Sequence, residues 1–351
     1  MTPAYLGEDL ILVLSPPRSG STMLQRMLGT HSQVQTHPEP HVLTPLAFQG
    51  VFHQIERAAF NHRVAAGALR EFVEFLPRGE EDYLDACRAY CSVLYGRARA
   101  AGGKRYFVDK TPNYADTILP FIVRLLPNAR YVVLTRHPVA QIASVANTFV
   151  GGDFQRALFQ RNVPAAFIPP MARFMRASSV PFVHVRYEDL VADPEATMRR
   201  VFAHLGLEFE EACLRFGEAE HITKTYGDPN IERHKTPVAD SASRWVDDLI
   251  DRPDREQACR EALVSISPQD LATIGYPLPT LWSALEAARM DAGRTRVGRT
   301  ARPVADFRWR WLARIARGLG RPAPQRLLSR LRDRLDTLIA YGARRHREDR
   351  T

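Results

Sequence analysis

Cysteine is scarce in this 351-residue chain, and long apolar runs are absent. The four cysteines have no paired spacing, which excludes a disulfide framework and favours buried thiols in a reducing compartment. No segment approaches the roughly 18 consecutive apolar residues that a membrane-spanning helix needs. The start of the chain carries Glu8 and Asp9 and no basic residue, so we expect a cytoplasmic protein without a signal peptide. A bias towards Arg, Ala and Pro favours a bacterial source.

Lysine is missing from residues 282–351, which hold 18 arginines and 7 acidic residues. This stretch carries a net charge of +11, so the other 281 residues carry about −2 of the overall +9. Because the basicity belongs to the end of the chain, it does not indicate a nucleic-acid surface on the main body. We therefore expect no nucleic-acid partner.

The basic end of the chain contains two amphipathic segments, at about 307–319 and 324–341, after a linker at 291–303. A basic amphipathic helix suits an anionic membrane surface. The same helix could instead pack on the core or on a second copy of the chain. The pattern thus predicts either peripheral contact with the inner face of the membrane or self-association.

Strands alternate with helices over most of the remaining sequence. The helical pattern covers about 20–31, 44–59, 64–75, 81–100, 138–150, 165–177 and 193–205, with a further helix opening at Pro112. Short apolar runs predict strands at 10–14, 105–108, 131–134 and 182–185. This alternation predicts an α/β fold with a P-loop-like parallel sheet flanked by helices. We expect one domain at 1–277 with a helical insert at about 44–100, and a helical extension at 278–351.

The first predicted strand runs into the turn Ser15-Pro16-Pro17-Arg18-Ser19-Gly20-Ser21-Thr22, and a helical pattern follows. A strand, tight turn and helix N-terminus direct backbone N–H groups and the positive end of the helix dipole at one point. Such a turn suits a bound phosphate. It lacks the Gly-Lys of a Walker A loop, and the third predicted strand ends in Thr135-Arg136 rather than in a metal-binding acid. We therefore expect no metal.

Cationic side chains follow the next two predicted strands. Lys110 comes directly after the second strand, and Arg136 follows the third. Ligands of parallel sheets lie beyond the carboxyl ends of the strands, so both side chains should lie near the first turn. The planar guanidinium of Arg136 suits a second phosphate.

The first turn, Arg136 with Ser144 eight residues later, and the segment Arg186-Tyr187-Glu188-Asp189-Leu190 together resemble the sulfotransferase superfamily. The resemblance covers about residues 9–277. It implies 3′-phosphoadenosine 5′-phosphosulfate (PAPS) as the sulfuryl donor. Arg136 and Ser144 would hold the donor's 3′-phosphate, with Lys235 or Arg233 in a late basic loop over it, and Tyr187 would contact the adenine or belong to the core. The 5′-phosphosulfate would be held by Arg18, Ser19, Gly20, Ser21 and Thr22.

The base is suggested by the same resemblance. Glu39 lies 21 residues after Arg18, a spacing that resembles the tyrosylprotein and polyketide-type branch, in which the equivalent glutamate is the base. Other branches use a histidine after the second conserved turn, where this chain has none. His41 is the alternative base or an orienting partner. Lys110 and Arg18 would stabilise charge on the transferring group.

The resemblance therefore predicts sulfuryl transfer from PAPS to a hydroxyl of a small-molecule, glycan or lipid acceptor. Residues 44–100 and 148–170 are expected to shape the acceptor site, but they do not name the acceptor. Two other functions stay open: a P-loop kinase or nucleotide hydrolase, and a non-catalytic membrane-binding adaptor built on an inactive core.

Overall fold

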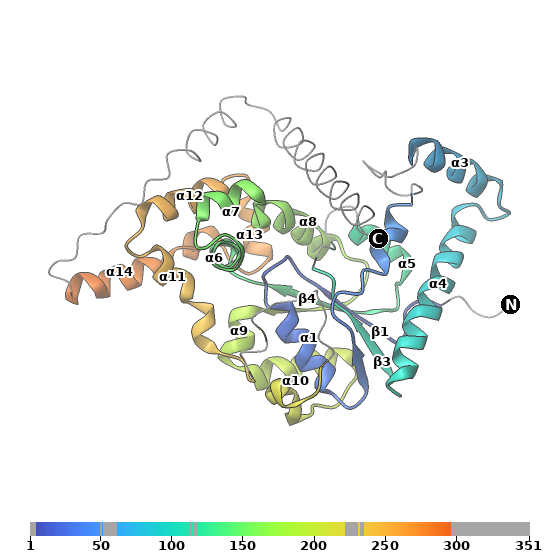
Figure 1. Cartoon of the computed structure of the whole chain (residues 1–351), viewed down its shortest axis with the longest axis horizontal. Helices are drawn as coiled ribbons and strands as arrows, with labels where there is room; N and C mark the ends of the chain where they lie inside the picture. The colour runs from blue at the N-terminus through green and yellow to red at the C-terminus, as the bar shows by residue number, and fades with distance from the viewer. Residues whose placement is uncertain are drawn as a thin grey trace, which may run out of the picture. The chain divides into compact units, whose positions relative to one another are not determined.

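The computed structural model describes residues 5–49, 51, 62–112, 114, 118–221, 231 and 235–295. Its centre is a five-stranded parallel sheet with strand order β2-β3-β1-β4-β5 (Figure 1). The predicted parallel α/β architecture is confirmed. The strands are β1 (Leu10–Leu14), β2 (Val34–Thr36), β3 (Tyr106–Asp109), β4 (Arg130–Thr135) and β5 (Phe182–Arg186).

Helices cover both faces of the sheet (Figure 1). Their N-terminal members are α1 (Ser21–Thr30), α2 (Leu43–Ala47), α3 (His62–Phe75), α4 (Glu80–Ala101), α5 (Ile118–Leu125), α6 (Pro138–Phe149) and α7 (Phe154–Gln160). The others are α8 (Val163–Ala177), α9 (Tyr187–Ala192), α10 (Pro194–Leu205), α11 (Arg244–Leu249), α12 (Pro253–Leu263), α13 (Pro268–Thr273) and α14 (Ser283–Thr295). Short 3-10 helices lie at Glu211–Glu218, Ala239–Ala242 and Leu278–Thr280.

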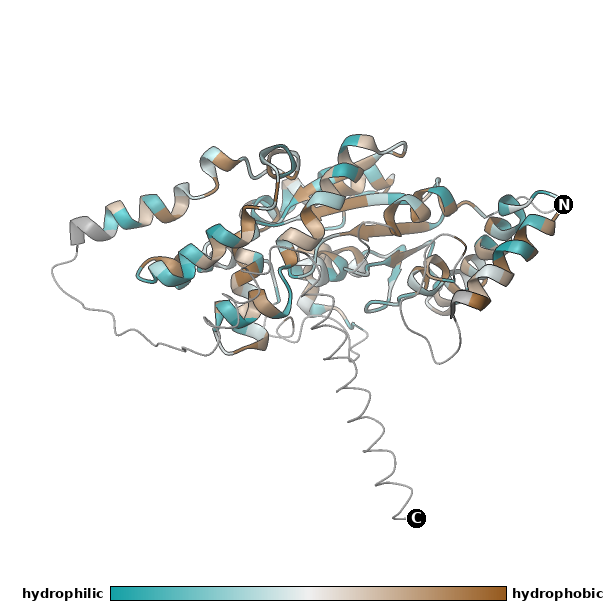
Figure 2. Ribbon diagram, turned by 90° about the horizontal axis from the view of Figure 1, so that it is seen from above, coloured by the Kyte–Doolittle hydropathy of each residue, from teal (hydrophilic) through white to brown (hydrophobic). Residues whose placement is uncertain are grey.

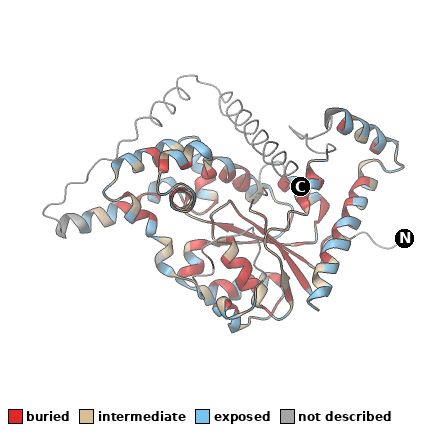
Figure 3. Cartoon of the chain, viewed as in Figure 1, coloured by how far each residue is buried: buried red, intermediate tan, exposed pale blue. Residues whose placement is uncertain are grey.

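The side chains of the central strands alternate between two apolar clusters. Leu10, Leu12 and Leu14 of β1 pack with α2, α4 and α5, whereas Ile11 and Val13 pack with α1, α9 and α10. All five residues are completely buried, as a strand covered on both faces requires. Figure 2 shows these apolar strands between helices of mixed polarity, and Figure 3 shows the buried sheet at the centre.

Several elements differ from the sequence prediction. The sequence does not predict β2, because three residues are too few to show a period; the strand forms by pairing with β3 at the edge of the sheet. The sequence also does not predict α7, which Asp153 caps by accepting a hydrogen bond from the Arg156 amide. Where a helix is expected to open at Pro112, the described residues Pro112 and Tyr114 are not helical, and α5 covers Ile118–Leu125. Thr111 and Tyr114 donate hydrogen bonds to Asp109 and hold this stretch beside the strand. Of the helix predicted at 44–59, α2 ends at Ala47 and most of the rest lies outside the described residues.

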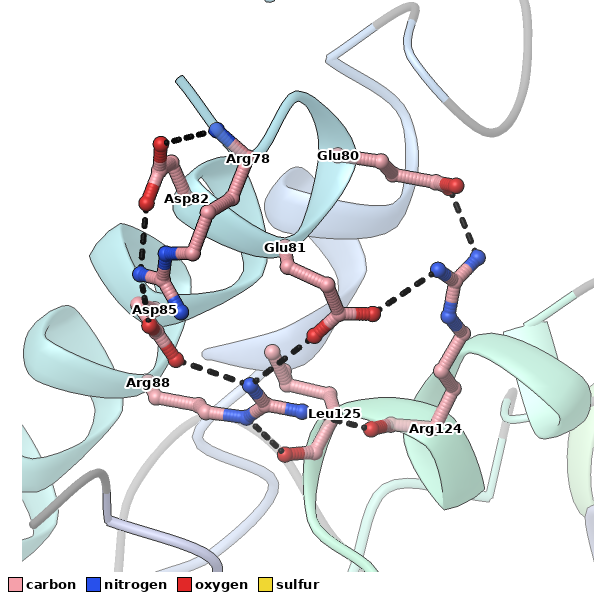
Figure 4. Close-up of polar contacts among 8 residues, drawn as sticks. All are labelled: Arg78, Glu80, Glu81, Asp82, Asp85, Arg88, Arg124 and Leu125. Carbon is pink, nitrogen blue, oxygen red and sulfur yellow. Dashed lines mark hydrogen bonds and ion pairs between the residues drawn. The ribbon is translucent and has the colours of Figure 1, made fainter. Parts of the chain in front are cut away.

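A network of charged side chains ties α4 to α5 (Figure 4). Arg88 is mostly buried and donates hydrogen bonds to the carbonyl oxygens of Leu125 (3.0 Å) and Arg124 (3.1 Å), which lie at the C-terminal end of α5. Arg124 in turn pairs with Glu80 at 2.8 Å and with Glu81 at 3.1 Å. The exposed ion pairs contribute little free energy of folding. The buried arginine, which satisfies carbonyl groups of the last helical turn, fixes the insert on the main body.

The sequence beyond residue 277 contributes to the packed core. Leu281, Trp282 and Leu285 are buried in the apolar cluster that contains Trp245 and Tyr276. Compactness divides the chain into residues 1–297 and 298–351. The two predicted basic segments lie outside the described residues, and the boundary at 277 stays a prediction. Within the described ranges, no helix is both long and apolar enough to cross a membrane.

Candidate active site

The turn after β1 has an unusual backbone. Arg18 has φ = 65° and Gly20 has φ = 85°, both in the left-handed region, which costs free energy for any residue except glycine. Gly20 directly precedes α1, so the backbone N–H groups of Ser21 and Thr22 stand at the helix N-terminus. A Cβ atom on Gly20 would lie 2.4 Å from the ring of Tyr187. The conformation and the space at this position therefore both require glycine.

Replacing Gly20 by alanine should destabilise the fold and distort the loop. The new methyl group collides with Tyr187, and a residue with a Cβ atom is strained at φ = 85°. We expect a loss of about 2–3 kcal/mol of unfolding free energy in urea titrations. Gly67→Ala is the matched control, because a Cβ atom at this helical position has nothing within 4 Å. That variant should be neutral or up to about 1 kcal/mol more stable, and equal losses in both variants would contradict a steric cause at Gly20.

A hydrogen bond from α6 supports the turn after β1. Gln141 and Ser19 are both completely buried, and the Gln141 amide donates a hydrogen bond of 2.8 Å to the Ser19 hydroxyl. Sequence reasoning missed Gln141. A signal for it existed, because Gln141 precedes Ser144 by three residues and so lies on the same side of the helix.

Arg18 and Ser144 are in direct contact. The Nε of Arg18 donates a hydrogen bond of 3.0 Å to the Ser144 hydroxyl, and its Nη2 donates one of 3.1 Å to Thr148. The guanidinium also lies 5.4 Å from the centre of the exposed Phe149 ring. The structure thus joins a residue expected at the transferring group to one expected at the 3′-phosphate. Thr148, the first residue of a segment expected to shape the acceptor site, accepts the second hydrogen bond from Arg18, a contact that the sequence did not predict.

Arg136 lies at the carboxyl end of β4 and is held by three contacts. Its Nη1 donates to the Arg18 carbonyl (3.2 Å), its Nη2 donates to the Ser241 carbonyl (2.8 Å), and its guanidinium lies 4.3 Å from the Tyr187 ring centre. The Tyr187 and Ser241 hydroxyls are 2.5 Å apart. Burial lowers the pKa of Arg136, and its buried Nε has no hydrogen-bond partner among the described residues. A desolvated cation with an unused donor is suited to bind an anion.

Glu39 and Lys110 form a buried ion pair next to the loop. Their Oε1 and Nζ atoms are 2.9 Å apart, and Nζ also donates a hydrogen bond of 3.3 Å to Thr22. The Lys110 side chain is 0% exposed and that of Glu39 is 14% exposed. Burying such a pair costs desolvation free energy, so it is weak evidence for a stabilising role. The contacts bring the predicted base, the predicted cation and the phosphate turn together.

The backbone of the segment that contains Glu39 and His41 is strained. Glu39 has φ = 37° and His41 has φ = 51°. Positive φ is uncommon for non-glycine residues, and such backbone strain is concentrated at functional sites. The Nδ1 of His41 lies 3.4 Å from the Thr44 hydroxyl. His37 instead faces its own segment, with Nδ1 2.9 Å from the Pro38 carbonyl. The structure therefore brings Glu39, and not His37, to Lys110.

Lys235 contacts the rest of the described structure through its backbone. Its side chain is exposed, and its carbonyl accepts a hydrogen bond of 2.9 Å from the Gly217 amide. Its alternative, Arg233, lies outside the described residues. The role of Lys235 over the 3′-phosphate stays a prediction. Of the late segment, Ser241 is the residue that contacts Arg136.

Two histidines, one following β4 and one in β5, are held neutral at pH 7. His137 stacks on Trp245 (4.4 Å between ring centres) with Nε2 2.8 Å from the Leu281 carbonyl, and His184 lies 2.8 Å from the Thr135 hydroxyl. Burial lowers the pKa of each from 6.5 to about 4. Since the folded pKa lies below the unfolded one, the free energy of unfolding is highest above pH 6.5 and falls as pH drops towards 4.

Acidification from pH 7 to pH 5 should therefore lower the unfolding free energy by about 2 kcal/mol for each of these histidines. Urea titrations at both pH values measure the change. His137→Gln and His184→Gln should each reduce the pH dependence, because glutamine does not titrate. An unchanged pH dependence in both variants would show that other groups cause it.

The described residues contain no group of three or more His, Cys, Asp or Glu side chains placed to hold a metal ion. The polar groups present at the carboxyl edge of the sheet are instead arginine, lysine, hydroxyls and helix N-terminal amides. This donor set suits two phosphate-like anions, with one carboxylate beside them. The fold and the site together have the features expected of an α/β protein that binds a phosphorylated ligand.

Comparison with known proteins identifies the family. Residues 10–211, more than half of the chain, match the family model described as "Sulfotransferase family". The chain belongs to the sulfotransferase family, and the predictions of this family and of a sulfotransferase enzyme are confirmed.

Individual relatives agree with the family assignment. Nodulation protein NoeE of Sinorhizobium fredii is 28% identical over 90% of this chain and 76% of its own length. Protein-tyrosine sulfotransferase A of Caenorhabditis elegans is 23% identical over 68% of this chain, which spans 61% of that relative. Among solved structures, the sulfotransferase domain of the Synechococcus PCC 7002 olefin synthase is 25% identical with a TM-score of 0.51, covering 74% of this chain and 97% of the domain. The sulfotransferase domain from the curacin biosynthetic pathway (24% identity, TM-score 0.53, covering 79% of this chain and 100% of the domain) shares the fold.

Proposed function

We propose that this sulfotransferase uses PAPS as its donor and transfers the sulfuryl group to a hydroxyl of a small-molecule, glycan or lipid acceptor. The observation that carries the proposal is the Glu39–Lys110–Thr22 contact beside the phosphate turn. It supplies a carboxylate and a cation where an acceptor hydroxyl would meet the donor. Arg136 is desolvated and its Nε is an unused hydrogen-bond donor, so it forms a second anion site at the same edge of the sheet.

The donor would be held at two anionic ends. The loop amides of Ser19 to Thr22 and the hydroxyls of Ser21 and Thr22 would bind the 5′-phosphosulfate, as helix N-termini bind phosphates. Arg136 and Ser144 would bind the 3′-phosphate, and Tyr187 would contact the adenine. Ser144 now accepts a hydrogen bond from Arg18. A hydroxyl that accepts a hydrogen bond still has its own hydrogen to donate, so Ser144 would donate to the 3′-phosphate while it accepts from Arg18.

Transfer would proceed by in-line displacement at sulfur. The acceptor oxygen forms the new O–S bond while the bond between sulfur and the donor's 5′-phosphate oxygen breaks. Glu39 takes the acceptor proton. Lys110 and Arg18 stabilise the negative charge that develops on the leaving phosphate oxygen, and such electrostatic stabilisation supplies much of the rate in related phosphoryl transfers. His41 is the alternative base.

Binding of adenosine 3′,5′-bisphosphate, the donor without its sulfuryl group, tests the donor assignment. Calorimetry in the presence of EDTA should show 1:1 binding that does not need Mg²⁺. ATP with Mg²⁺ should neither bind more tightly nor be hydrolysed. The opposite pattern would favour the kinase or nucleotide-hydrolase alternative, and binding of neither nucleotide would favour the non-catalytic adaptor.

Ser144→Ala should weaken binding of adenosine 3′,5′-bisphosphate by about 10- to 150-fold, because one hydrogen bond to a charged group contributes about 1.5–3 kcal/mol. Adenosine 5′-phosphosulfate, which lacks the 3′-phosphate, should bind the variant and the wild type equally. Calorimetry with both nucleotides measures the difference. A loss of the same size for both would place Ser144 away from the 3′-phosphate.

The acceptor class is the broadest part of the proposal. Relatives bear the names nodulation protein and protein-tyrosine sulfotransferase, and solved neighbours belong to olefin and curacin pathways. A screen with labelled donor should therefore include glycans, glycolipids, phenols and hydroxylated acyl chains. The acceptor that gives saturable, Glu39-dependent transfer is the physiological class.

The proposal also covers where the enzyme works. Four buried, free cysteines favour a reducing, cytoplasmic compartment, and the amino-acid bias favours a bacterial source. We further infer a catalytic domain at 1–277 and an extension at 278–351 that contacts anionic membrane or a second copy of the chain. Flotation of full-length and tail-truncated protein with anionic vesicles tests membrane contact, and equal flotation of the two would exclude it.

A further inference from the structure

A second acidic side chain lies one residue before Lys110 and is not used by the proposed reaction. Asp109 is completely buried at the carboxyl end of β3. One carboxylate oxygen accepts hydrogen bonds from the hydroxyls of Tyr95 (2.5 Å) and Tyr114 (2.9 Å), and the other accepts one from Thr111 (3.0 Å). These four residues form the Asp109 cluster.

Burying the Asp109 carboxylate costs desolvation free energy that an apolar side chain would not cost. Burial raises the pKa of Asp109, and the hydrogen bonds and the nearby His41 oppose that rise. An asparagine could not replace it without turning an NH₂ group towards a hydroxyl donor, and an apolar residue would leave three buried hydroxyls without this acceptor. A carboxylate is thus the side chain that satisfies all three donors at once.

The position of the cluster relative to the sheet suggests its purpose. Successive residues of a strand point to opposite faces. Phe107 belongs to the cluster of α4 and α5, and its ring lies 5.4 Å from that of Tyr95, so Asp109 shares this face. Lys110 reaches the opposite face, where its Nζ contacts Glu39 and Thr22. The Asp109 cluster therefore anchors the backbone of β3 one residue before Lys110, from the opposite face of the sheet.

Tyr95 connects the Asp109 cluster to α4 of the helical insert. It is the one member of the cluster that comes from α4, and its side chain is 2% exposed. Thr111 and Tyr114 come from the chain just after Lys110. The hydrogen bonds of Asp109 thus join β3, the following turn and α4 at one point, and they fix the origin of the Lys110 side chain from both directions along the chain.

We propose that Asp109 is a positioning residue, which through Tyr95, Thr111 and Tyr114 holds Lys110 Nζ against Glu39 and the phosphate turn. The inference rests on the proposed function, because it assigns to the cluster the placement of a catalytic cation. Catalytic groups must be held closely, since a displacement of about 1 Å can cost about 100-fold in rate. The sites expected for the donor's 3′-phosphate, on β4 and α6, do not involve the cluster.

Three variants separate positioning from general stability. Asp109→Asn removes one acceptor oxygen, and Tyr95→Phe removes one donor while keeping the carboxylate. Tyr83→Phe is the matched control, because Tyr83 is also a buried tyrosine of α4, and its hydroxyl donates instead to Gln49 (2.7 Å). If Asp109→Asn does not fold, Tyr95→Phe carries the test alone.

The first measurement is the reactivity of Lys110 itself. Reductive methylation followed by peptide mass spectrometry, at equal folded fraction and without nucleotide, should label Lys110 at least 5-fold faster in Asp109→Asn and Tyr95→Phe than in the wild type. Tyr83→Phe should label like the wild type. Equal labelling in all four proteins would overturn the proposal, whatever their activity.

The second measurement separates turnover from donor binding. Asp109→Asn should lower kcat at least 10-fold and Tyr95→Phe about 3- to 10-fold, with the Kd of adenosine 3′,5′-bisphosphate within 2-fold of the wild type. Tyr131→Phe is the control for turnover and should keep kcat, because this buried tyrosine of β4 lies outside the segments expected to shape the acceptor site and donates to the Leu126 carbonyl (2.9 Å). Unchanged kcat in both cluster variants, or parallel loss of nucleotide binding, would overturn the positioning role. A wild-type protein that neither binds the nucleotide nor transfers sulfate would instead overturn the proposed function, and the Lys110 labelling would still report on Asp109.

Discussion

Glu39→Gln should lower kcat for sulfuryl transfer by about 10²–10⁴-fold, the range that a positioned general base contributes. Glutamine keeps an oxygen that can accept the hydrogen bond from Lys110, which is 2.9 Å away in the wild type, but it cannot take a proton. The KM values for donor and acceptor should change little, since the carboxylate acts mainly as the acceptor hydroxyl is deprotonated. Steady-state kinetics with the acceptor found by screening measure all three constants.

The choice of glutamine matters because Lys110 is completely buried. Glu39→Ala would leave a buried ammonium without its partner and would cost several kcal/mol of folding free energy, so a loss of activity would be ambiguous. His41→Gln is the matched variant for the alternative base. If Glu39→Gln retains kcat within about 3-fold while His41→Gln loses it, the base is His41 and the assignment of Glu39 is wrong.

Arg136→Ala should weaken binding of adenosine 3′,5′-bisphosphate by at least about 100-fold, roughly the 3 kcal/mol that a buried charge-assisted contact contributes. The guanidinium is already desolvated and oriented by the Arg18 and Ser241 carbonyls, so little ordering cost opposes the anion. Calorimetry gives the Kd directly. The loss should be smaller for adenosine 5′-phosphosulfate, because that nucleotide lacks the 3′-phosphate.

Two further variants control for charge and for general damage. Arg136→Lys keeps the positive charge but loses the planar pair of donors, so it should fall between the wild type and Arg136→Ala. Arg199→Ala removes an arginine whose partner, Glu195, lies on the same exposed helix face, and nucleotide binding should not change. Nucleotide binding by Arg136→Ala within 3-fold of the wild type would rule out this arginine as the 3′-phosphate site.

Much of the fold follows from local sequence pattern. The apolar runs of β1 and β4 are long enough to identify, and an unbroken apolar run of this length is typical of a parallel strand buried on both faces. Helices with a capping residue or an N-terminal proline, such as α10 with Asp193 and Pro194, also begin where expected. The edge strand β2 escapes prediction because its three residues form a strand only through pairing with β3.

The site divides in the same way. The sequence by itself determined that Arg18, Lys110 and Arg136 follow parallel strands and so meet at one edge of the sheet, because strand direction fixes which ends come together. Only the tertiary structure decided which of them touch. The Arg18–Ser144 and Arg136–Ser241 contacts join residues more than 100 positions apart. The role of the Asp109 carboxylate can be inferred only once Tyr95 is seen to donate a hydrogen bond to it. Such contacts depend on how helices dock on the sheet. Side-chain packing between distant segments produces no periodic pattern of residues from which these contacts could be predicted.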